Sequence, residues 1–500
     1  NLIGGNSMLW QEWVSIALYL VMMLLIGYVA YKRTTDSSDY MLGGRKMGPG
    51  VTAMSAGASD MSGWMLMGLP GAMYATGLSA IWLAVGLVIG AYLNYLLVAP
   101  RLRVFTEMAN DSITIPDFLE NRFRDHSNWL RILSASVIII FFTFYTSAGL
   151  VSGGKLFESS FGLNYQTGVI VTISVVILYT LFGGFTAVSW TDFAQGVIMF
   201  LALVLVPFVA LTDIGGVDTA VNSATTINAD LFDLFKGTTT LGIIGLLAWG
   251  LGYFGQPHII VRFMAIRDVK SLKTARRIGM SWMTVSIIGA VMTGFVGIAY
   301  FRGQGNPLGD PETVFIQFSE VLFHPFITGF LLAAILAAVM STVSSQLLVT
   351  SSALTEDFYR KFFNKDASEK TMVLAGRVGV LLVGVVATLM SLNPSSTILT
   401  LVGYAWAGFG SAFGPAILLS LYWSKMTRQG ALAGILVGAI TVILWIVTGL
   451  STVLYEMVPG FFLSMLAIVL VSNFTSQKEQ KRINREFGEM EAELAAAKKE

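Results

Sequence analysis

Cysteine is absent from this 500-residue chain, and charged residues are scarce, at 12% of the total. The missing cysteine excludes disulfides and thiolate metal sites. The three histidines, His126, His258 and His324, lie far apart in the sequence, so a catalytic zinc is not expected. An average soluble domain has about 25% charged residues. With 55% hydrophobic residues, this chain has too little charge to cover a water-facing surface of its size.

The charge balance and the polar residues also disfavour several classes of function. The net charge of +1 gives no reason to expect a nucleic-acid partner. No nucleophile–base pair or metal-ligand spacing is visible, so we expect no enzyme. No protein partner is evident, and the expected surroundings are a lipid bilayer.

Apolar segments long enough to cross a bilayer, about 20 residues each, recur along the whole chain. The 51 glycines fit this picture, because small residues let membrane helices pack closely. We therefore expect an all-α membrane protein with 13 transmembrane helices. The predicted spans are residues 9–31, 49–76, 77–100, 129–157, 164–185, 190–213, 238–264, 277–301, 325–352, 372–392, 397–423, 428–449 and 452–472.

The basic residues predict the orientation of these spans. Cytoplasmic loops of membrane proteins are rich in Lys and Arg. With the N-terminus outside and the C-terminus in the cytoplasm, only three of the 31 basic residues fall in outside loops, namely Lys155, Lys236 and Arg302. A missed or invented span in the middle of the chain would destroy this asymmetry.

Two predicted spans are interrupted by small, polar or helix-breaking residues. Span two contains Ser-Ala-Gly-Ala-Ser-Asp-Met-Ser-Gly-Trp at 55–64, and span seven contains Trp-Gly-Leu-Gly-Tyr-Phe-Gly-Gln-Pro at 249–257. Glycine costs about 1 kcal/mol and proline about 3 kcal/mol inside a helix. Because the breaks lie five spans apart, they fall at matching positions of two halves with opposite topology, which points to a transport site. Close helix packing through small residues is the alternative.

Asp60 is the most deeply placed carboxylate in any predicted span. A central Asp costs roughly 2.5–3.5 kcal/mol on insertion scales, so an intramembrane acid indicates function by default. Direct ligation of an ion and structural support of the unwound segment both remain open for Asp60.

Span nine presents two hydroxyls on one helix face. Ala338, Ser341 and Thr342 are spaced i, i+3 and i+4, although Ser and Thr also commonly bond back to their own helix. Ser341 and Ala58 of span two both lie about 14 Å from the cytoplasmic end of their spans, at 1.5 Å per residue. Sodium prefers several oxygen ligands. We therefore expect an ion site of about five oxygens where the two spans meet.

Aromatic residues are candidates for the wall of an adjacent pocket. Trp249 and Tyr253 lie in interrupted span seven, and Tyr145 lies in span four. Aromatic residues in membrane spans more often pack or anchor at the interface, so position alone leaves their role open.

Several stretches of the chain resemble the sodium/solute symporter family. They include the two interrupted segments and Leu-Ala-Ala-Val-Met-Ser-Thr at 336–342. Shorter stretches at 42–45, 187–192 and 404–410 agree, and the similarity to the bacterial proline-transporting members covers most of the chain.

The resemblance implies a LeuT-type fold with an inverted 5+5 repeat core, one flanking helix before it and two after it. The flanking helix and first cytoplasmic loop would be residues 1–48, and the first repeat 49–213. The second repeat would be residues 214–423, the two C-terminal flanking helices 424–472 and the cytoplasmic tail 473–500. The Glu- and Lys-rich tail is expected to be a solvated helix, with partner binding as the alternative.

The resemblance also implies roles for individual residues. The sodium site would use Ala58, Met61, Ala338, Ser341 and Thr342, with Asp60 as ligand or support. Proline binding would involve Tyr145, Trp249, Tyr253, Pro257 and Ser62. Ser55, Arg45 and Gln346 would also affect function, but the resemblance assigns them no specific role.

The expected function is sodium-coupled uptake of L-proline by alternating access, in a bacterial inner membrane. Sodium is the coupling ion. Another family solute, such as a sugar or pantothenate, is the nearest alternative. A channel or a membrane sensor on the same scaffold would belong to a different class of function.

Overall fold

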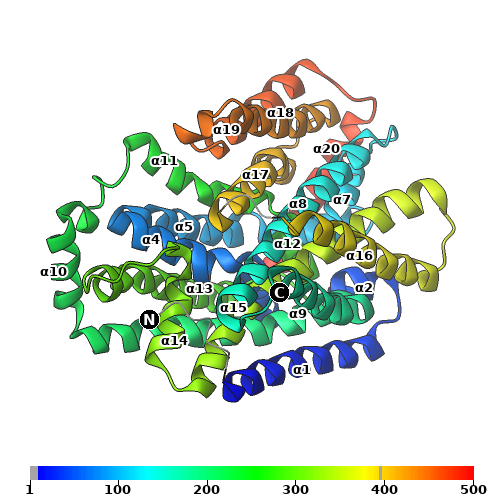
Figure 1. The fold of residues 1–500 in the computed structure, drawn as a ribbon. Helices are drawn as coiled ribbons and strands as arrows, with labels where there is room; N and C mark the ends of the chain where they lie inside the picture. The colour runs from blue at the N-terminus through cyan, green and yellow to red at the C-terminus, as the bar shows by residue number, and fades with distance from the viewer. Residues whose placement is uncertain (1–8, 394–396, 500) are drawn as a thin grey trace.

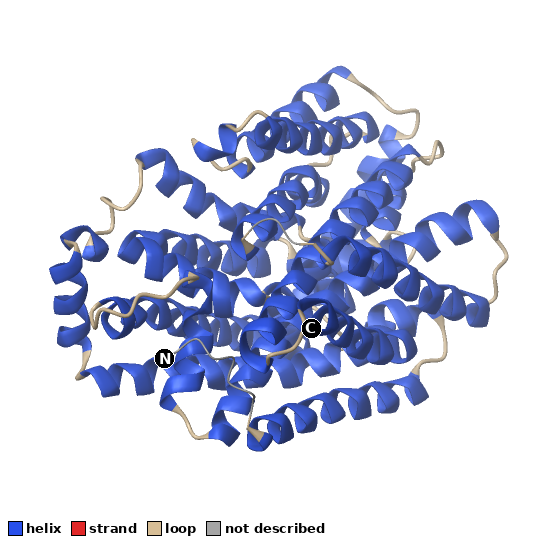
Figure 2. Cartoon of the chain, viewed as in Figure 1, coloured by secondary structure: helices blue, strands red, loops and turns tan. Residues whose placement is uncertain are grey.

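The computed structural model describes residues 9–393 and 397–499, and these residues are almost entirely helical (Figure 2). The described residues contain no β-strand, and one isolated bridge pairs Met47 with Ile266. The predicted all-α class is confirmed. The expected start at residues 1–8 and the last residue of the tail lie outside the described residues.

The helices follow one another along the chain with short connections. The α-helices are α1 (Trp10–Arg33), α2 (Ser37–Leu42), α3 (Pro49–Asp60), α4 (Leu69–Thr76), α5 (Ile81–Leu97), α6 (Ala99–Met108), α7 (Ile115–Phe123), α8 (Trp129–Phe161), α9 (Tyr165–Ile214), α10 (Val217–Ile227), α11 (Thr240–Ala248), α12 (Pro257–Ala265), α13 (Ser271–Gly297), α14 (Val314–Leu322), α15 (Pro325–Ser352), α16 (Glu369–Ser391), α17 (Ile398–Tyr422), α18 (Arg428–Val447), α19 (Met457–Phe474) and α20 (Gln480–Lys499). The 3₁₀ or π segments are η1 (Gly43–Arg45), η2 (Trp64–Gly68), η3 (Gly77–Ala80), η4 (Ala229–Phe232), η5 (Trp249–Gly255), η6 (Ile298–Arg302), η7 (Pro311–Thr313), η8 (Ala353–Phe363) and η9 (Leu450–Thr452).

Ten helices of the described chain are long and apolar enough to cross a membrane, or eleven if one bent pair forms a single span. Each of the thirteen predicted ranges lies largely on helix, but several share a continuous helix in the structure. Two of them lie within α9, which is kinked at Gly184 (φ 59°, ψ −140°). The exact number of thirteen and the repeat layout stay predictions.

The burial of the helices shows which of them form the centre of the bundle. In α15, 83% of the most apolar window is buried, against 28% in α1. Figure 1 shows α1 along one edge of the molecule and α18 with α19 at the opposite edge, while α8, α12 and α15 lie between them. Helix α1 packs on α9, and α18 and α19 pack on α17. The exposed apolar face of α1 is typical of a lipid-facing helix.

Both sequence interruptions are breaks in the structure. Helix α3 ends at Asp60, and two non-helical residues precede the π segment η2. In the second break, α11 continues into η5, and α12 leaves at a bend of 45°. Backbone freed from a helix at membrane depth is tolerated where it is buried in protein or lines a cavity.

Helix α5 and segment η5 approach each other so closely that Gly90 and Gly250 have no space for a side chain. A Cβ on Gly90 would lie 2.3 Å from the Gly250 carbonyl oxygen, which is far inside contact distance. Helix α5 therefore holds the broken segment in place through backbone-to-backbone packing, as small residues allow in membrane bundles.

The C-terminal helix α20 is not solvated on every face. Ile483, Phe487, Met490 and Leu494 recur every three to four residues and are buried. This face packs on α6, while the opposite face carries most of the charged residues.

We expect Gly90→Ala to destabilise the protein, because the new methyl group has no space beside Gly250. Overpacking of this kind typically costs about 1–3 kcal/mol. Gly309→Ala is the matched control, since nothing lies within 4 Å of a Cβ there. Thermal unfolding in detergent measures both variants. Equal midpoints for the two would contradict the packing of α5 on η5.

Candidate functional site

The structure brings the end of α3 and the middle of α15 together through oxygen atoms. The Ser341 hydroxyl donates to the Ala58 carbonyl at 2.6 Å and to the Ala338 carbonyl at 3.0 Å. The Thr342 hydroxyl donates to the same Ala338 carbonyl at 3.2 Å. All four residues are at most 1% exposed. Four of the five predicted sodium-site residues therefore form one buried layer of carbonyl and hydroxyl oxygens.

Met61, the fifth predicted member of the sodium site, lies at the break itself. Its N–H completes α3 by donating to the Gly57 carbonyl at 2.9 Å, while its own backbone leaves the helical region (φ −80°, ψ 83°). The Asp60 carbonyl accepts from the Ser62 N–H at 3.0 Å and from the Trp64 indole at 3.0 Å. These bonds stabilise the turn that presents the Met61 backbone.

The Asp60 side chain links α3 to the other broken segment. The Tyr253 hydroxyl of η5 donates to Asp60 Oδ2 at 2.5 Å. Asp60 Oδ1 is buried and accepts no hydrogen bond from any described residue. The two breaks, far apart in sequence, therefore meet through one charge-assisted hydrogen bond. Among the described residues, no hydrogen bond joins the Asp60 carboxylate to the Ser341 hydroxyl.

An aromatic stack forms beside the second break. Trp249 stacks on Tyr455, with ring centroids 5.2 Å apart, and on Trp406 at 6.4 Å. Tyr253 meets the Trp406 ring edge-on at 5.0 Å, and the Trp406 indole donates to the Trp249 carbonyl at 2.8 Å. Two of the predicted substrate residues thus lie in one aromatic cluster, with Trp406 as an additional member that our sequence analysis did not assign.

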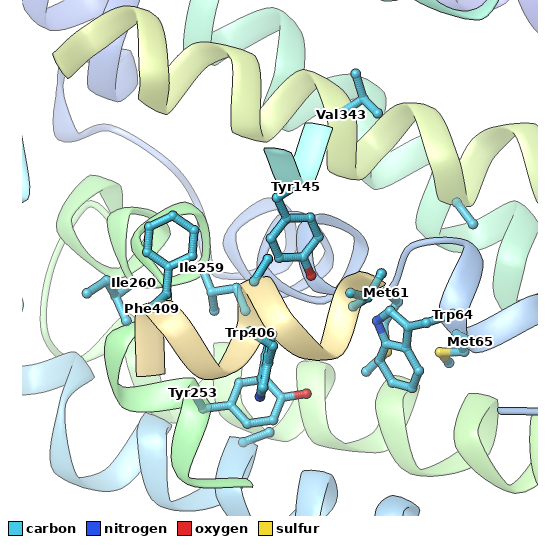
Figure 3. Packing of buried hydrophobic residues seen from close by; sticks show 14 of the residues in the cluster. Met61, Trp64, Met65, Tyr145, Tyr253, Ile259, Ile260, Val343, Trp406 and Phe409 are labelled. Atoms are coloured by element: carbon cyan, nitrogen blue, oxygen red, sulfur yellow. The ribbon is translucent and has the colours of Figure 1, made fainter. Parts of the chain in front are cut away.

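Tyr145 lies on α8 and faces the same region. Figure 3 shows its ring in the layer of buried side chains that contains Tyr253 and Trp406, with Met61 and Trp64 to one side. Its hydroxyl is buried without a partner among the described residues, and its ring lies 5.7 Å from that of His258. A buried hydroxyl without a partner is costly unless a ligand or water satisfies it.

A buried ion pair next to the oxygen layer was missed in the sequence. The Arg262 guanidinium lies 3.3 Å from Asp192 Oδ2 and donates to the Ser55 and Ser345 hydroxyls at 3.0 and 2.8 Å. The Ser55 hydroxyl donates to Asp192 at 2.8 Å, and Ser59 lies 2.9 Å from Ser345. This cluster ties α3, α9, α12 and α15 together and gives the predicted Ser55 a structural role.

A signal for this ion pair was present in the sequence. Asp192 closes the stretch 187–192, and Arg262 follows the proline of span seven. Intramembrane charges usually pair with one another, so two charges of opposite sign within predicted spans are candidate partners.

The remaining predicted residues lie outside the oxygen layer. Arg45 lies near the ends of α6 and α12, where it bonds Asp111 at 2.9 Å, the Met264 carbonyl at 2.9 Å and the Ser112 carbonyl at 2.5 Å. Pro257 begins α12 and lines a small cavity of about 20 Å³ with Leu348 and others.

Gln346 and Ser62 make only limited contacts. Gln346 Oε1 accepts from the Thr146 hydroxyl at 3.2 Å, and its amide nitrogen is buried without a partner among the described residues. The Ser62 hydroxyl accepts a long bond of 3.5 Å from the Trp64 N–H. Neither contact assigns a role.

Within the described residues, ten or eleven helical segments long and apolar enough to cross a membrane surround two joined helix breaks, which is the architecture of a secondary transporter. The chain belongs to the sodium:solute symporter family, whose model matches residues 40–438. It is a multi-pass protein of the bacterial plasma membrane, and it is a transporter and not an enzyme.

Several curated proteins resemble the chain over almost its full length. The osmoregulated proline transporter OpuE of Bacillus subtilis (strain 168) is 62% identical, over 97% of this chain and 99% of that protein. The high-affinity proline transporter PutP of the same organism is 60% identical, over 92% and 97%. Sodium/proline symporter 2 of Staphylococcus saprophyticus is 56% identical, over 94% of both chains.

Solved structures show the same fold at low sequence identity. A sodium-coupled sialic acid symporter in a substrate-bound outward-open state matches with a TM-score of 0.81 at 20% identity, over 93% of this chain and 98% of that chain. MhsT in complex with L-phenylalanine matches with a TM-score of 0.52 at 15% identity, over 84% and 97%.

We expect Arg262→Met to destabilise the protein by about 3–5 kcal/mol, because it leaves the Asp192 carboxylate buried without its cation. The double variant Arg262→Met/Asp192→Leu removes both charges and should recover most of this loss. Thermal unfolding in detergent measures the difference. A double variant less stable than the single one would show that the pair is not the cause.

Proposed function

We propose that this protein takes up L-proline together with sodium by alternating access. The observation that carries the proposal is the buried oxygen layer in which Ser341 of α15 meets the Ala58 carbonyl at the end of broken α3. Membership of the sodium:solute symporter family supports the coupling ion. Three relatives at 56–62% identity are named as proline transporters or as a sodium/proline symporter, which supports the substrate.

The proposed topology has thirteen spans, with the N-terminus outside and the C-terminus in the cytoplasm. Residues 49–213 and 214–423 form the two inverted repeats, residues 1–48 precede them, two flanking helices occupy 424–472, and 473–500 form the cytoplasmic tail. The matched helix breaks and the scarcity of Lys and Arg in the outside loops support this arrangement.

The proposed sodium site consists of the Ala58, Met61 and Ala338 carbonyls with the Ser341 and Thr342 hydroxyls. A hydroxyl that now donates its hydrogen to a carbonyl can rotate, so that its oxygen lone pairs face a cation instead. Sodium would then bridge α3 and α15 in place of the Ser341–Ala58 hydrogen bond. The layer is buried, so sodium binding would replace hydrogen bonds between these oxygens with stronger contacts to the ion. It would not expose the polar groups to lipid.

The proposed proline site lies between the two breaks. The pyrrolidine ring is apolar and suits the aromatic side chains of Trp249, Tyr253 and Trp406. Tyr145 offers a buried hydroxyl with no partner among the described residues. The proline carboxylate would lie near the N-terminus of a half-helix, where the helix dipole favours an anion. Asp60 would hold Tyr253 in position through their short bond, and thereby couple the pocket to α3.

The sodium gradient is sufficient for uphill transport. One charge moved across 100 mV is worth about 2.3 kcal/mol, and a tenfold sodium gradient adds about 1.4 kcal/mol. At one sodium per proline, these terms together support an accumulation of roughly several hundred-fold.

Radiolabelled uptake into proteoliposomes tests the proposal directly. We expect proline to accumulate with an inward sodium gradient and to equilibrate only slowly without one. Equal uptake in both conditions would refute sodium coupling. Transport of a sugar or pantothenate in place of proline would refute the substrate, and ion currents without solute transport would indicate a channel.

We expect Ser341→Ala/Thr342→Ala to raise the sodium concentration for half-maximal uptake by tenfold or more, because hydrogen bonds and contacts to charged groups are worth roughly 1.5–3 kcal/mol. Thr350→Ala is a matched control on the same helix, since Thr350 is buried and bonds only the Gln346 carbonyl. Sodium dependence of proline uptake gives the comparison. An unchanged half-maximal concentration in the double variant would exclude both hydroxyls from the site.

A further inference from the structure

The turn between α6 and α7 is a conformationally constrained corner of the bundle. Asn110 and Asp111 both have left-handed backbone angles, with φ of 56° and 47°. Such angles are unfavourable for residues other than glycine, and they persist where surrounding contacts hold them. Arg45 supplies one such contact through its 2.9 Å bond to Asp111. A change in this contact would allow the corner to move.

The helix before the corner is tied to the broken spans. Arg103 of α6 donates to the Ile266 carbonyl, directly after α12, at 2.6 Å. Arg45 bonds both the Thr106 hydroxyl of α6 and the Met264 carbonyl of α12. Helix α6 is therefore bonded firmly to α12, which carries the buried Arg262.

The helix after the corner is tied to α8 and η8. Arg131 of α8 pairs with Asp117 and Glu120 of α7 and with Asp357 of η8, the last at 2.8 Å. Helix α17 bonds both sides of the corner, because Arg122 of α7 donates to the Ser420 carbonyl and Arg101 of α6 donates to the Leu421 carbonyl, each at 2.9 Å. The corner is thus a joint between α12 on one side and α8 with η8 on the other, with α17 as a shared neighbour.

Helix α20 lies across this joint and contacts both sides of it. The Phe487 ring of α20 lies 5.6 Å from the Phe105 ring of α6. The Arg122 guanidinium of α7 lies 4.9 Å from the Phe487 ring. One side chain of the tail therefore packs against both helices that flank the corner.

Ion pairs extend this contact on each side of the joint. Glu491 pairs with Arg101 of α6 at 3.2 Å, and Glu486 accepts from Arg124, which ends α7, at 2.7 Å. Glu479 lies 2.9 Å from His126. A cavity of about 560 Å³ lies between α20 and the corner and is lined by Arg124 and Glu486, so solvent and ions reach the Arg124–Glu486 pair.

We propose that α20 is an autoinhibitory clamp, which holds α6 against α7, restrains opening of this end of the bundle and is loosened by ionic strength. Partly exposed pairs are individually weak and are screened by salt, since the Debye length falls from about 10 Å at 0.1 M to about 3 Å at 1 M. The clamp responds to the salt concentration on the side of α20. The inference rests on the proposed function, in which this side is the cytoplasm and its opening releases proline.

Cysteine labelling tests the clamp without any transport measurement. Because the chain has no cysteine, Ser352→Cys places a single thiol in the small cavity beside Pro257, where Ser352 is 7% exposed. In this background we expect Glu479→Gln/Glu486→Gln/Glu491→Gln to react several-fold faster with a membrane-permeable maleimide. Glu489→Gln is the matched control, because Glu489 pairs only with Arg485 on the same helix and both are exposed. Equal labelling rates in the triple variant and the control would overturn the proposal.

A charge exchange distinguishes loss of the ion pair from a general loss of stability. Arg124→Glu should speed labelling. Because Glu486 also pairs with Arg482, the exchange is made in an Arg482→Gln background, where Arg124→Glu/Glu486→Arg should restore the rate by re-forming the pair with opposite signs. An exchanged variant that labels as fast as Arg124→Glu in the same background would contradict the clamp.

Uptake at increasing internal KCl tests the response to salt. We expect the initial rate of proline uptake by the full-length protein to rise with internal KCl. The triple Gln variant should have a high rate of uptake already at low KCl, and this rate should change little as KCl is raised. Identical salt responses in both proteins would overturn the proposal. Absence of proline uptake in the unmodified protein would instead refute the proposed function, and the labelling rates would still decide on the clamp.

Discussion

The hydrogen bond from the Ser341 hydroxyl to the Ala58 carbonyl is the contact on which the rest of the site depends. Helix α3 stops in the middle of the bundle, and the end of a helix leaves carbonyl groups without partners. In an apolar bilayer such groups must be satisfied within the protein. Ser341 satisfies one of them from α15, which with α17 is one of the two most buried spans of the described chain. The same oxygens suit a cation, so the bond that stabilises the break also prepares an ion site.

The other buried polar contacts connect this break to the elements that would move. Asp60 joins α3 to η5 through Tyr253, and the Arg262–Asp192 pair joins α12 to α9 beside Ser55 of α3. Ser55, Ala58 and Asp60 of α3 therefore contact the ion pair, the oxygen layer and the aromatic cluster, respectively. Because α3 contacts all three, an ion that bridges α3 and α15 would favour one arrangement of the aromatic cluster, the oxygen layer and the ion pair over another. Alternating access requires such a difference in ion contacts between two states of the protein. At the far end of α12, the contacts of Arg45 and α6 lead to the corner that α20 spans.

Local sequence patterns predicted much of this arrangement. Glycine and proline clusters located both helix breaks, and counting residues from the span ends placed Ser341 and Ala58 at the same depth. The partner of Asp60 was not predictable, because it depends on which distant helix lies opposite that face of α3. The Arg262–Asp192 pair was missed for the same reason, although both charges were visible in predicted spans. The docking of α20 was also missed, since its four apolar residues are few among many charges and only α6 explains their burial.

A structure determined in saturating sodium tests the central claim most directly. The account predicts ion density between the end of α3 and α15, in contact with the Ala58 and Ala338 carbonyls and the Ser341 hydroxyl, with the Ser341–Ala58 hydrogen bond replaced. Density at Asp60 Oδ1 beside Tyr253, with the Ser341–Ala58 bond intact, would contradict it.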